Sequence, residues 1–105
     1  MDTKYNGWTN YETWLVNLWL DNDGSSETLR EMAESTYDTK ADFNEYSFSK
    51  IVREYVEETY ADSIPESGMI SDLVGAAFSS VNWQEIASHY ADDLPDPEEE
   101  EEIEE

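Results

Sequence analysis

The stretch GWTNYETWLVNLWLDNDG, residues 7–24, decides the fold because it carries helix signals at both ends and apolar residues between them. Thr9 and Glu12 form a T-x-x-E capping box, which satisfies free backbone amides at the start of a helix. Gly24 is typical of a helix stop. The apolar positions between these signals follow helical spacing: Tyr11, Trp14, Leu15, Leu18 and Trp19.

This helix is apolar around most of its circumference, because only Thr13, Asn17 and Asp21 form a clear polar stripe. Helices of that kind are normally buried. We therefore expect residues 11–22 to be the central helix of the fold, with Trp14 and Trp19 in the core. Trp8 precedes the cap, so the pattern does not assign it to the core.

Helical spacing continues along the chain and predicts four more helices. The second begins near Ser25 or Ser26, residues 38–45 form a loop, and the third covers about 46–62. The fourth, about 68–80, is nearly uncharged and has a continuous apolar face, and the fifth covers about 83–93 after an Asn82 cap. The predicted fold class is all-α: a compact bundle of about five short helices in residues 1–94, followed by a disordered acidic tail at 95–105.

Charge is the strongest compositional signal. The 105 residues hold 27 acidic and five basic side chains, for a formal net charge of -22. Such a surface repels nucleic acid and anionic membranes, so we expect neither as a direct partner. No apolar run reaches the ~18 residues of a membrane span, and residues 1–8 do not resemble a signal peptide. We expect a soluble protein of the host cell cytoplasm.

The sequence offers no convincing catalytic, metal or cofactor site, so an enzyme is not expected. Cysteine is absent, and His89 is the only histidine, which argues against a zinc site and favours a structural histidine at or near the surface. DNDG at 21–24 has the wrong residues at both ends of a calcium loop and predicts a helix-terminal turn instead. The four glycines are scattered and form no phosphate-binding loop.

Acidic side chains recur three or four residues apart on the predicted helices, where Cβ atoms are roughly 5–6 Å from one another. That separation is comparable to the distance between neighbouring phosphates of a DNA strand. General solubility, adaptation to high salt, and ion pairs with Lys50 and Arg53 are alternative explanations. The predicted phosphate-mimicking, partner-binding carboxylates are Glu27, Glu31, Glu34, Asp38, Glu54, Glu57, Glu58, Asp62, Asp92 and Asp93.

Two stretches resemble a known family: NGWTNYETWLVNLWLDND near the start and VNWQEIASHY at residues 81–90. The family comprises small acidic proteins of phages, plasmids and some archaea, and it is largely uncharacterised. The resemblance implies a mobile-element origin and an all-helical fold, and it transfers no catalytic residues. The acidic composition is also similar in kind to that of phage DNA mimics such as the overcome-classical-restriction protein.

These observations lead to one functional hypothesis and two alternatives. The leading hypothesis is a DNA-mimic inhibitor that occupies the nucleic-acid groove of a basic host protein, such as a restriction or CRISPR effector. The first alternative is an interaction or assembly module that binds through aromatic surface, with Trp8, Tyr5 or Tyr46 in contact with the partner. The second is an acidic, salt-adapted housekeeping protein. A homodimer is compatible with each, and the glutamate run at 98–102 either binds a basic groove or only solubilises the chain.

Overall fold

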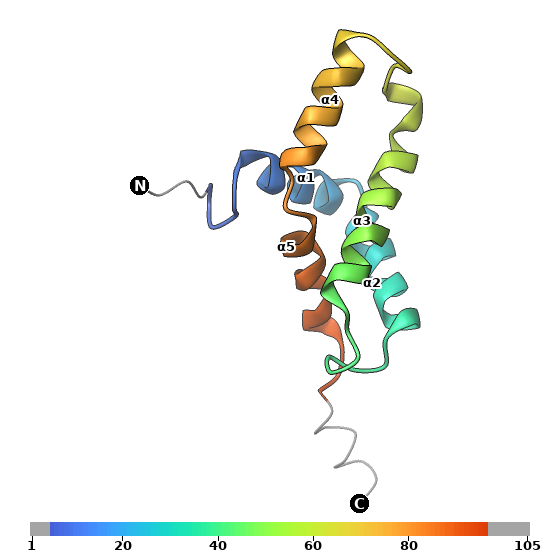
Figure 1. The fold of residues 1–105 in the computed structure, drawn as a ribbon. Coiled ribbons are helices and arrows are strands. Elements are labelled where there is room, and N and C mark those ends of the chain that lie inside the picture. Colours follow the sequence, from blue (N-terminus) through green and yellow to red (C-terminus); the bar gives the residue numbers. More distant parts are fainter. Residues whose placement is uncertain (1–4, 97–105) are drawn as a thin grey trace, which may run out of the picture.

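The computed structural model describes residues 5–96, which form five α-helices and two short 3-10 helices. In chain order they are α1 (Tyr11–Asn22), α2 (Ser25–Thr36), α3 (Glu45–Thr59), η1 (Ala61–Ser63), α4 (Met69–Ser80), α5 (Trp83–Ser88) and η2 (His89–Asp93). Residues 5–96 contain no strand beyond an isolated bridge between Tyr5 and Trp8. The predicted all-α bundle of about five short helices is confirmed (Figure 1).

The core lies mainly between α3 and α5, which run side by side (Figure 1). Residues spaced four apart on α3 form one buried stripe, because i and i+4 lie on the same face of a helix. The stripe packs against α5 and η2, and α2 closes the remaining side. The fully or nearly fully buried apolar residues from these elements are Phe48, Val52, Val56, Ile86, Ala87, Tyr90, Leu29 and Ala33.

The predicted capping box of α1 is wrong. Asn10 is the N-cap: its side-chain oxygen accepts hydrogen bonds from the Thr13 amide at 2.9 Å and the Thr13 hydroxyl at 2.6 Å. Thr9 serves another purpose, since its amide donates to the Glu85 carboxylate of α5 at 3.0 Å. Thr9 therefore bonds to a residue distant in sequence, and the N-cap lies one residue further along the chain, at Asn10.

The buried face of α1 also differs from the prediction. Thr13, placed by its chemistry on the polar stripe, is completely buried, as is Leu20, whereas Trp14 is half-buried and Trp19 is 57% exposed. The Thr13 hydroxyl accepts a hydrogen bond from the Asn82 amide at 2.8 Å. This bond turns the Thr13 side of α1 towards the α4–α5 junction, so Trp19 faces outward and α1 is not a wholly buried central helix.

The two stretches that carry the family resemblance pack against each other. Asn82 caps α5, as predicted, because its side-chain oxygen accepts from the Glu85 amide at 3.1 Å. Its side-chain amide also donates to the Thr9 hydroxyl at 3.1 Å, and the Asn10 side chain donates to the Ser80 carbonyl at 2.7 Å. These polar contacts fix the start of α1 to the junction between α4 and α5.

α4 begins one residue after the predicted start, behind Gly68, whose φ of 104° suits glycine. Its apolar face is not core: none of its twelve residues is buried. Met69 is 73% exposed, Ile70 51% and Leu73 58%. α4 rises away from the body (Figure 1), and within residues 5–96 it contacts chiefly α1, so the apolar side chains of its first two turns lack a second helix to pack on.

The chain after α5 differs little from expectation where the structure describes it. The predicted fifth helix is an α-helix only to Ser88 and continues as the 3-10 segment η2 to Asp93. Pro95 and Asp96 contact the body, since the Lys40 amide donates to the Pro95 carbonyl at 2.9 Å and its ammonium pairs with Asp96 at 3.3 Å. Of the predicted tail at 95–105, residues 97–105 with the glutamate run lie outside the described residues, and the domain boundary stays a prediction.

None of the helices in residues 5–96 combines the length and the apolar character that a membrane span requires.

Candidate functional site

An apolar groove of about 420 Å³ opens between α1, the end of α3 and α4. α1 supplies one wall, α3 and the segment after it supply the second, and α4 supplies the third. The lining side chains are Leu15, Val16, Trp19, Leu20, Val56, Tyr60, Ser63, Ile64, Val74 and Phe78. Leu20 and Val56 belong to the buried core, so the groove is continuous with the interior of the protein.

The groove exists because α4 is held only at its C-terminal end. There, Asn10 bonds to the Ser80 carbonyl, and the Trp83 indole N–H donates to the Phe78 carbonyl at 3.0 Å. Phe78 and Trp83 also make an edge contact with ring centroids 5.8 Å apart. The opposite end of α4 follows the exposed segment Pro65–Gly68. The helix is thereby oriented without being packed along its length, and the space beside it stays open.

From Val56 onward, the α3 wall of the groove carries acidic side chains and no basic ones, as do the α1 and α4 walls, whereas Lys50 and Arg53 precede it on the same helix. Segments 11–22 and 54–80 contain eight Asp or Glu residues and no Lys or Arg. Four of the five basic residues of the chain lie between residues 30 and 53, and the fifth, Lys4, precedes the described residues. The field around the groove is therefore negative, while its lining is almost entirely apolar.

One polar pair closes the corner where α1 meets the end of α3. The Tyr60 hydroxyl, on a lining residue, donates to the Asp23 carboxylate, and the Ser25 amide donates to the same carboxylate at 2.9 Å. The bond to Asp23, with some burial, raises the pKa of Tyr60 to about 12. Partial burial opposes ionisation of Asp23, but the bonds from Tyr60 and Ser25 outweigh it and lower the pKa of this carboxyl. The DNDG stretch is thus a helix-terminal turn, as predicted.

The profile of a family of unknown function, DUF7249, matches residues 1–104. The chain belongs to DUF7249. No curated protein matches the chain, and no solved structure matches it either. Membership of DUF7249 therefore assigns no role to any residue, and the case for a site rests on the geometry described above.

All ten carboxylates predicted as phosphate mimics are exposed in this DUF7249 chain. Glu27, Glu31 and Glu34 lie on α2, with Asp38 just beyond it, and Glu54, Glu57 and Glu58 lie on α3, with Asp62 on η1. Asp92 and Asp93 belong to η2. Within residues 5–96, only Glu57 and Asp93 of the ten form ion pairs, with Arg53 at 3.0 Å and Arg30 at 2.6 Å. Their role as a phosphate track remains a prediction.

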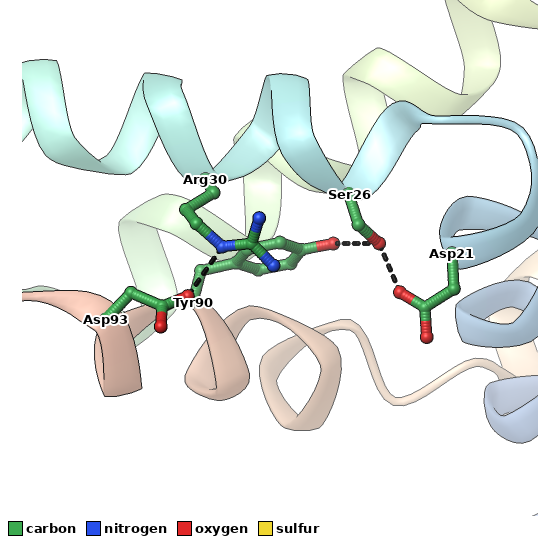
Figure 2. Close-up of polar contacts among 5 residues, drawn as sticks. All are labelled: Asp21, Ser26, Arg30, Tyr90 and Asp93. Atoms are coloured by element: carbon green, nitrogen blue, oxygen red, sulfur yellow. Dashed lines mark hydrogen bonds and ion pairs between the residues drawn. The ribbon is translucent and has the colours of Figure 1, made fainter.

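A small polar pocket of about 150 Å³ lies where α1, α2 and η2 meet. Figure 2 shows its contacts: Ser26 donates to Asp21 and accepts from the Tyr90 hydroxyl at 3.4 Å, and Arg30 bonds to Asp93. The bond to Asp93 raises the pKa of Arg30, and burial raises the pKa of Tyr90. Ser26 is thus tied to a carboxylate and a phenol, an arrangement that holds α2 to its neighbours.

The residues predicted for aromatic binding lie outside the groove. Tyr5 and Tyr46 are 39% and 58% exposed, and Trp8 is half-buried with its ring 4.6 Å from that of His89. His89 is exposed, as expected for a structural histidine at the surface of this DUF7249 member. Sequence reasoning missed Trp19 and α4 as groove residues. Local pattern did not reveal these residues, since the continuous apolar face of stretch 69–81 is equally typical of a helix packed in the core.

Proposed function

We propose that this protein acts by binding another protein through the apolar groove between α1, α3 and α4. The observation that carries the proposal is the exposure of Trp19 at the edge of a groove whose third wall, α4, has no buried residue. Contiguous apolar surface rimmed by polar residues marks interaction sites. This function corresponds to the aromatic interaction module, with the contacting residues moved from Trp8, Tyr5 and Tyr46 to the groove.

The energetics favour a protein ligand. Apolar area removed from water contributes roughly 25 cal/mol per Å², and tryptophan is enriched among the residues that dominate binding energy. A small-molecule site usually adds a few convergent polar groups that orient the ligand. Here the Tyr60 hydroxyl is already engaged by Asp23, which leaves Ser63 as the other polar lining side chain. Such a lining suits apolar side chains presented by a protein.

The test is affinity capture from host-cell lysate with three matched forms of the full chain. They are the wild type, the groove variant Trp19→Gln/Val74→Gln, and the control Tyr46→Gln, which replaces an equally exposed aromatic residue outside the groove. We expect the control to retain the captured protein and the groove variant to lose it while staying folded by circular dichroism. Equal capture by all three forms would contradict the proposal.

A second candidate function is the DNA-mimic inhibitor of a basic nucleic-acid-binding host protein of the restriction or CRISPR type. The exposure of all ten candidate carboxylates, with only Glu57 and Asp93 of them in ion pairs within residues 5–96, supports it. The resemblance to proteins of phages and plasmids, which would place it in the host cytoplasm, agrees with this candidate. It requires electrostatic complementarity and association that weakens with salt.

The two functions separate in the same capture experiment. If the protein is a mimic, the variant Glu31→Gln/Glu34→Gln, which removes two charges from α2, should no longer capture the partner. The wild type should also lose the partner in ~0.5 M salt, where charges are screened within a few ångströms. The groove variant then captures as the wild type does. If only the groove variant loses the captured protein, the result favours binding through the groove.

A further inference from the structure

Resting on the proposed function, the structure points to the class of partner: we propose that the groove binds a basic amphipathic helix of another protein. Its apolar face would lie on α1, the end of α3 and α4, and its Lys or Arg residues would face the acidic rim. Helix-in-groove binding of this kind is a common mode of peptide recognition.

The shape of the site suits a helix. The groove is bounded by three elements, α1, the end of α3 and α4, and its lining is apolar on each of them. α4 has twelve residues and is therefore about 18 Å long, which matches about three turns of an inserted helix. Val16 and Trp19 on α1, with Val74 and Phe78 on α4, offer apolar side chains on facing walls. A helix laid between them would complete a bundle that α4 leaves incomplete.

The charge of the site selects a basic helix. Glu12, Val16, Trp19 and Asp23 follow one another at i, i+4, i+7 and i+11, so an acidic residue stands at each end of the apolar stripe of α1. On the opposite wall, Asp62 is adjacent to Ser63, and Glu66 is two residues from Ile64. Both are exposed. Positive side chains flanking an apolar face would therefore meet negative ones around the groove.

The same charges argue against two other occupants. A second copy of the chain would bring two acid-rimmed walls together, and like charges across an interface are costly. Residues 97–105 of the chain itself contain seven glutamates and one isoleucine. That segment is repelled by the walls and offers one apolar side chain to a groove lined by ten residues.

The test is a titration of three synthetic peptides of about 14 residues with the full chain. Binding is measured by the fluorescence anisotropy of a label on the peptide. The first is an amphipathic Leu/Lys helix. The second has the same pattern with Glu in place of Lys, and the third is a Leu/Lys peptide of identical composition with its helical periodicity scrambled. We expect the Leu/Lys helix to bind at least ~10-fold more tightly than the other two.

Matched variants locate the binding. Asp62→Asn/Glu66→Gln and Glu31→Gln/Glu34→Gln change the net charge equally, but the first pair lies at the groove and the second lies on α2, towards the other end of the molecule (Figure 1). We expect the first pair to weaken the Leu/Lys helix ~3–10-fold at low salt and the second to leave it within about twofold. Trp19→Gln/Val74→Gln should weaken it at least ~10-fold, and Tyr46→Gln should not.

The remaining outcomes overturn the inference in distinguishable ways. If the Leu/Glu helix binds as tightly as the Leu/Lys helix and both are lost in the groove variant, the groove binds helices without preference for charge, and the proposed function stands. If no peptide binds and sedimentation shows a dimer that the groove variant dissociates, the occupant is a second copy. If the Leu/Lys helix binds the groove variant as it binds the wild type, attraction is only general, and the proposed function loses its support as well.

Discussion

Thr13 joins α1 to the junction between α4 and α5 and is the most consequential buried polar residue of the fold. Its hydroxyl donates to Asn10 and accepts from the Asn82 amide. Thr13→Val keeps the shape and removes both bonds, leaving the Asn82 amide without this acceptor. We expect a loss of about 1–3 kcal/mol in the free energy of unfolding, measured by urea denaturation.

Thr28→Val is the matched control for that substitution, because Thr28 is an exposed threonine in the first turn of α2. A surface change of this kind should stay within about 0.5 kcal/mol of the wild type. Equal losses for the two variants would mean that the Thr13 hydroxyl contributes nothing beyond the general effect of replacing a hydroxyl by a methyl group in a helix.

The hydrogen bond between Tyr60 and Asp23 predicts an abnormal tyrosine titration. The pKa of Tyr60 is raised to about 12 from an ordinary value of 10.0. Stability from this bond is therefore complete below pH ~10 and is lost as the pH rises through the raised pKa. Because the pKa of Asp23 is lowered, the same contribution is present above the ordinary carboxyl pKa and is lost as the pH falls through the lowered one.

We expect Asp23→Asn to bring the pKa of Tyr60 back towards 10.0. The titration is measured by NMR of ring-labelled tyrosine. Asp21→Asn is the control, because Asp21 accepts from Ser26 instead. A Tyr60 pKa that stays near 12 in Asp23→Asn would show that the negative charge of Asp23 does not cause the shift.

At the scale of elements, α4 should contribute little to stability although it is the least charged helix. Leu29 on α2 is completely buried, whereas Leu73 on α4 is 58% exposed. The same substitution therefore has different expected costs: about 2–5 kcal/mol for Leu29→Ala and under about 1 kcal/mol for Leu73→Ala. Urea denaturation of both variants checks this. A large loss for Leu73→Ala would place α4 in the core after all.

The existence of the five α-helices followed from local pattern, but the 3-10 segments and the buried faces of α1 and α4 did not. Local spacing shows that a helix has apolar sides, and burial depends on what the rest of the chain brings to each side. For α1 the deciding partner was Asn82, 69 residues from Thr13. For α4 the deciding fact is that, within residues 5–96, no second helix packs along it.

The candidate site was predictable only in its charge. Exposure of the acidic residues on α2 and α3 followed from helical spacing, since charged side chains occupy the face opposite the apolar stripe. The groove was not predicted, because its walls come from three helices whose positions relative to one another do not follow from local spacing. Trp19 was expected inside because its helix is apolar around most of its circumference, yet large apolar residues also occur where a protein binds another.

At the scale of the whole molecule, the net charge of -22 sets the response to salt. Self-repulsion destabilises the compact state, and the screening distance falls from about 30 Å at ~0.01 M salt to about 8 Å at ~0.15 M. We expect the thermal midpoint, followed by circular dichroism, to rise across this range and then level off. Glu31→Gln/Glu34→Gln should raise the midpoint at low salt and reduce the rise, because neither acid is ion-paired within residues 5–96.

A salt-adapted protein would respond differently over the same titration. It would be largely unfolded at ~0.15 M salt and would gain structure only at molar concentrations, far beyond the range in which screening of surface charge is complete. The core is continuous from α2 through α3 to α5 and is formed by apolar contacts, which are favourable without added salt. We therefore expect native helical content already in dilute buffer. Recovery confined to molar salt would instead identify the acidic surface as an adaptation to a saline environment, and its carboxylates would then need no partner to explain them.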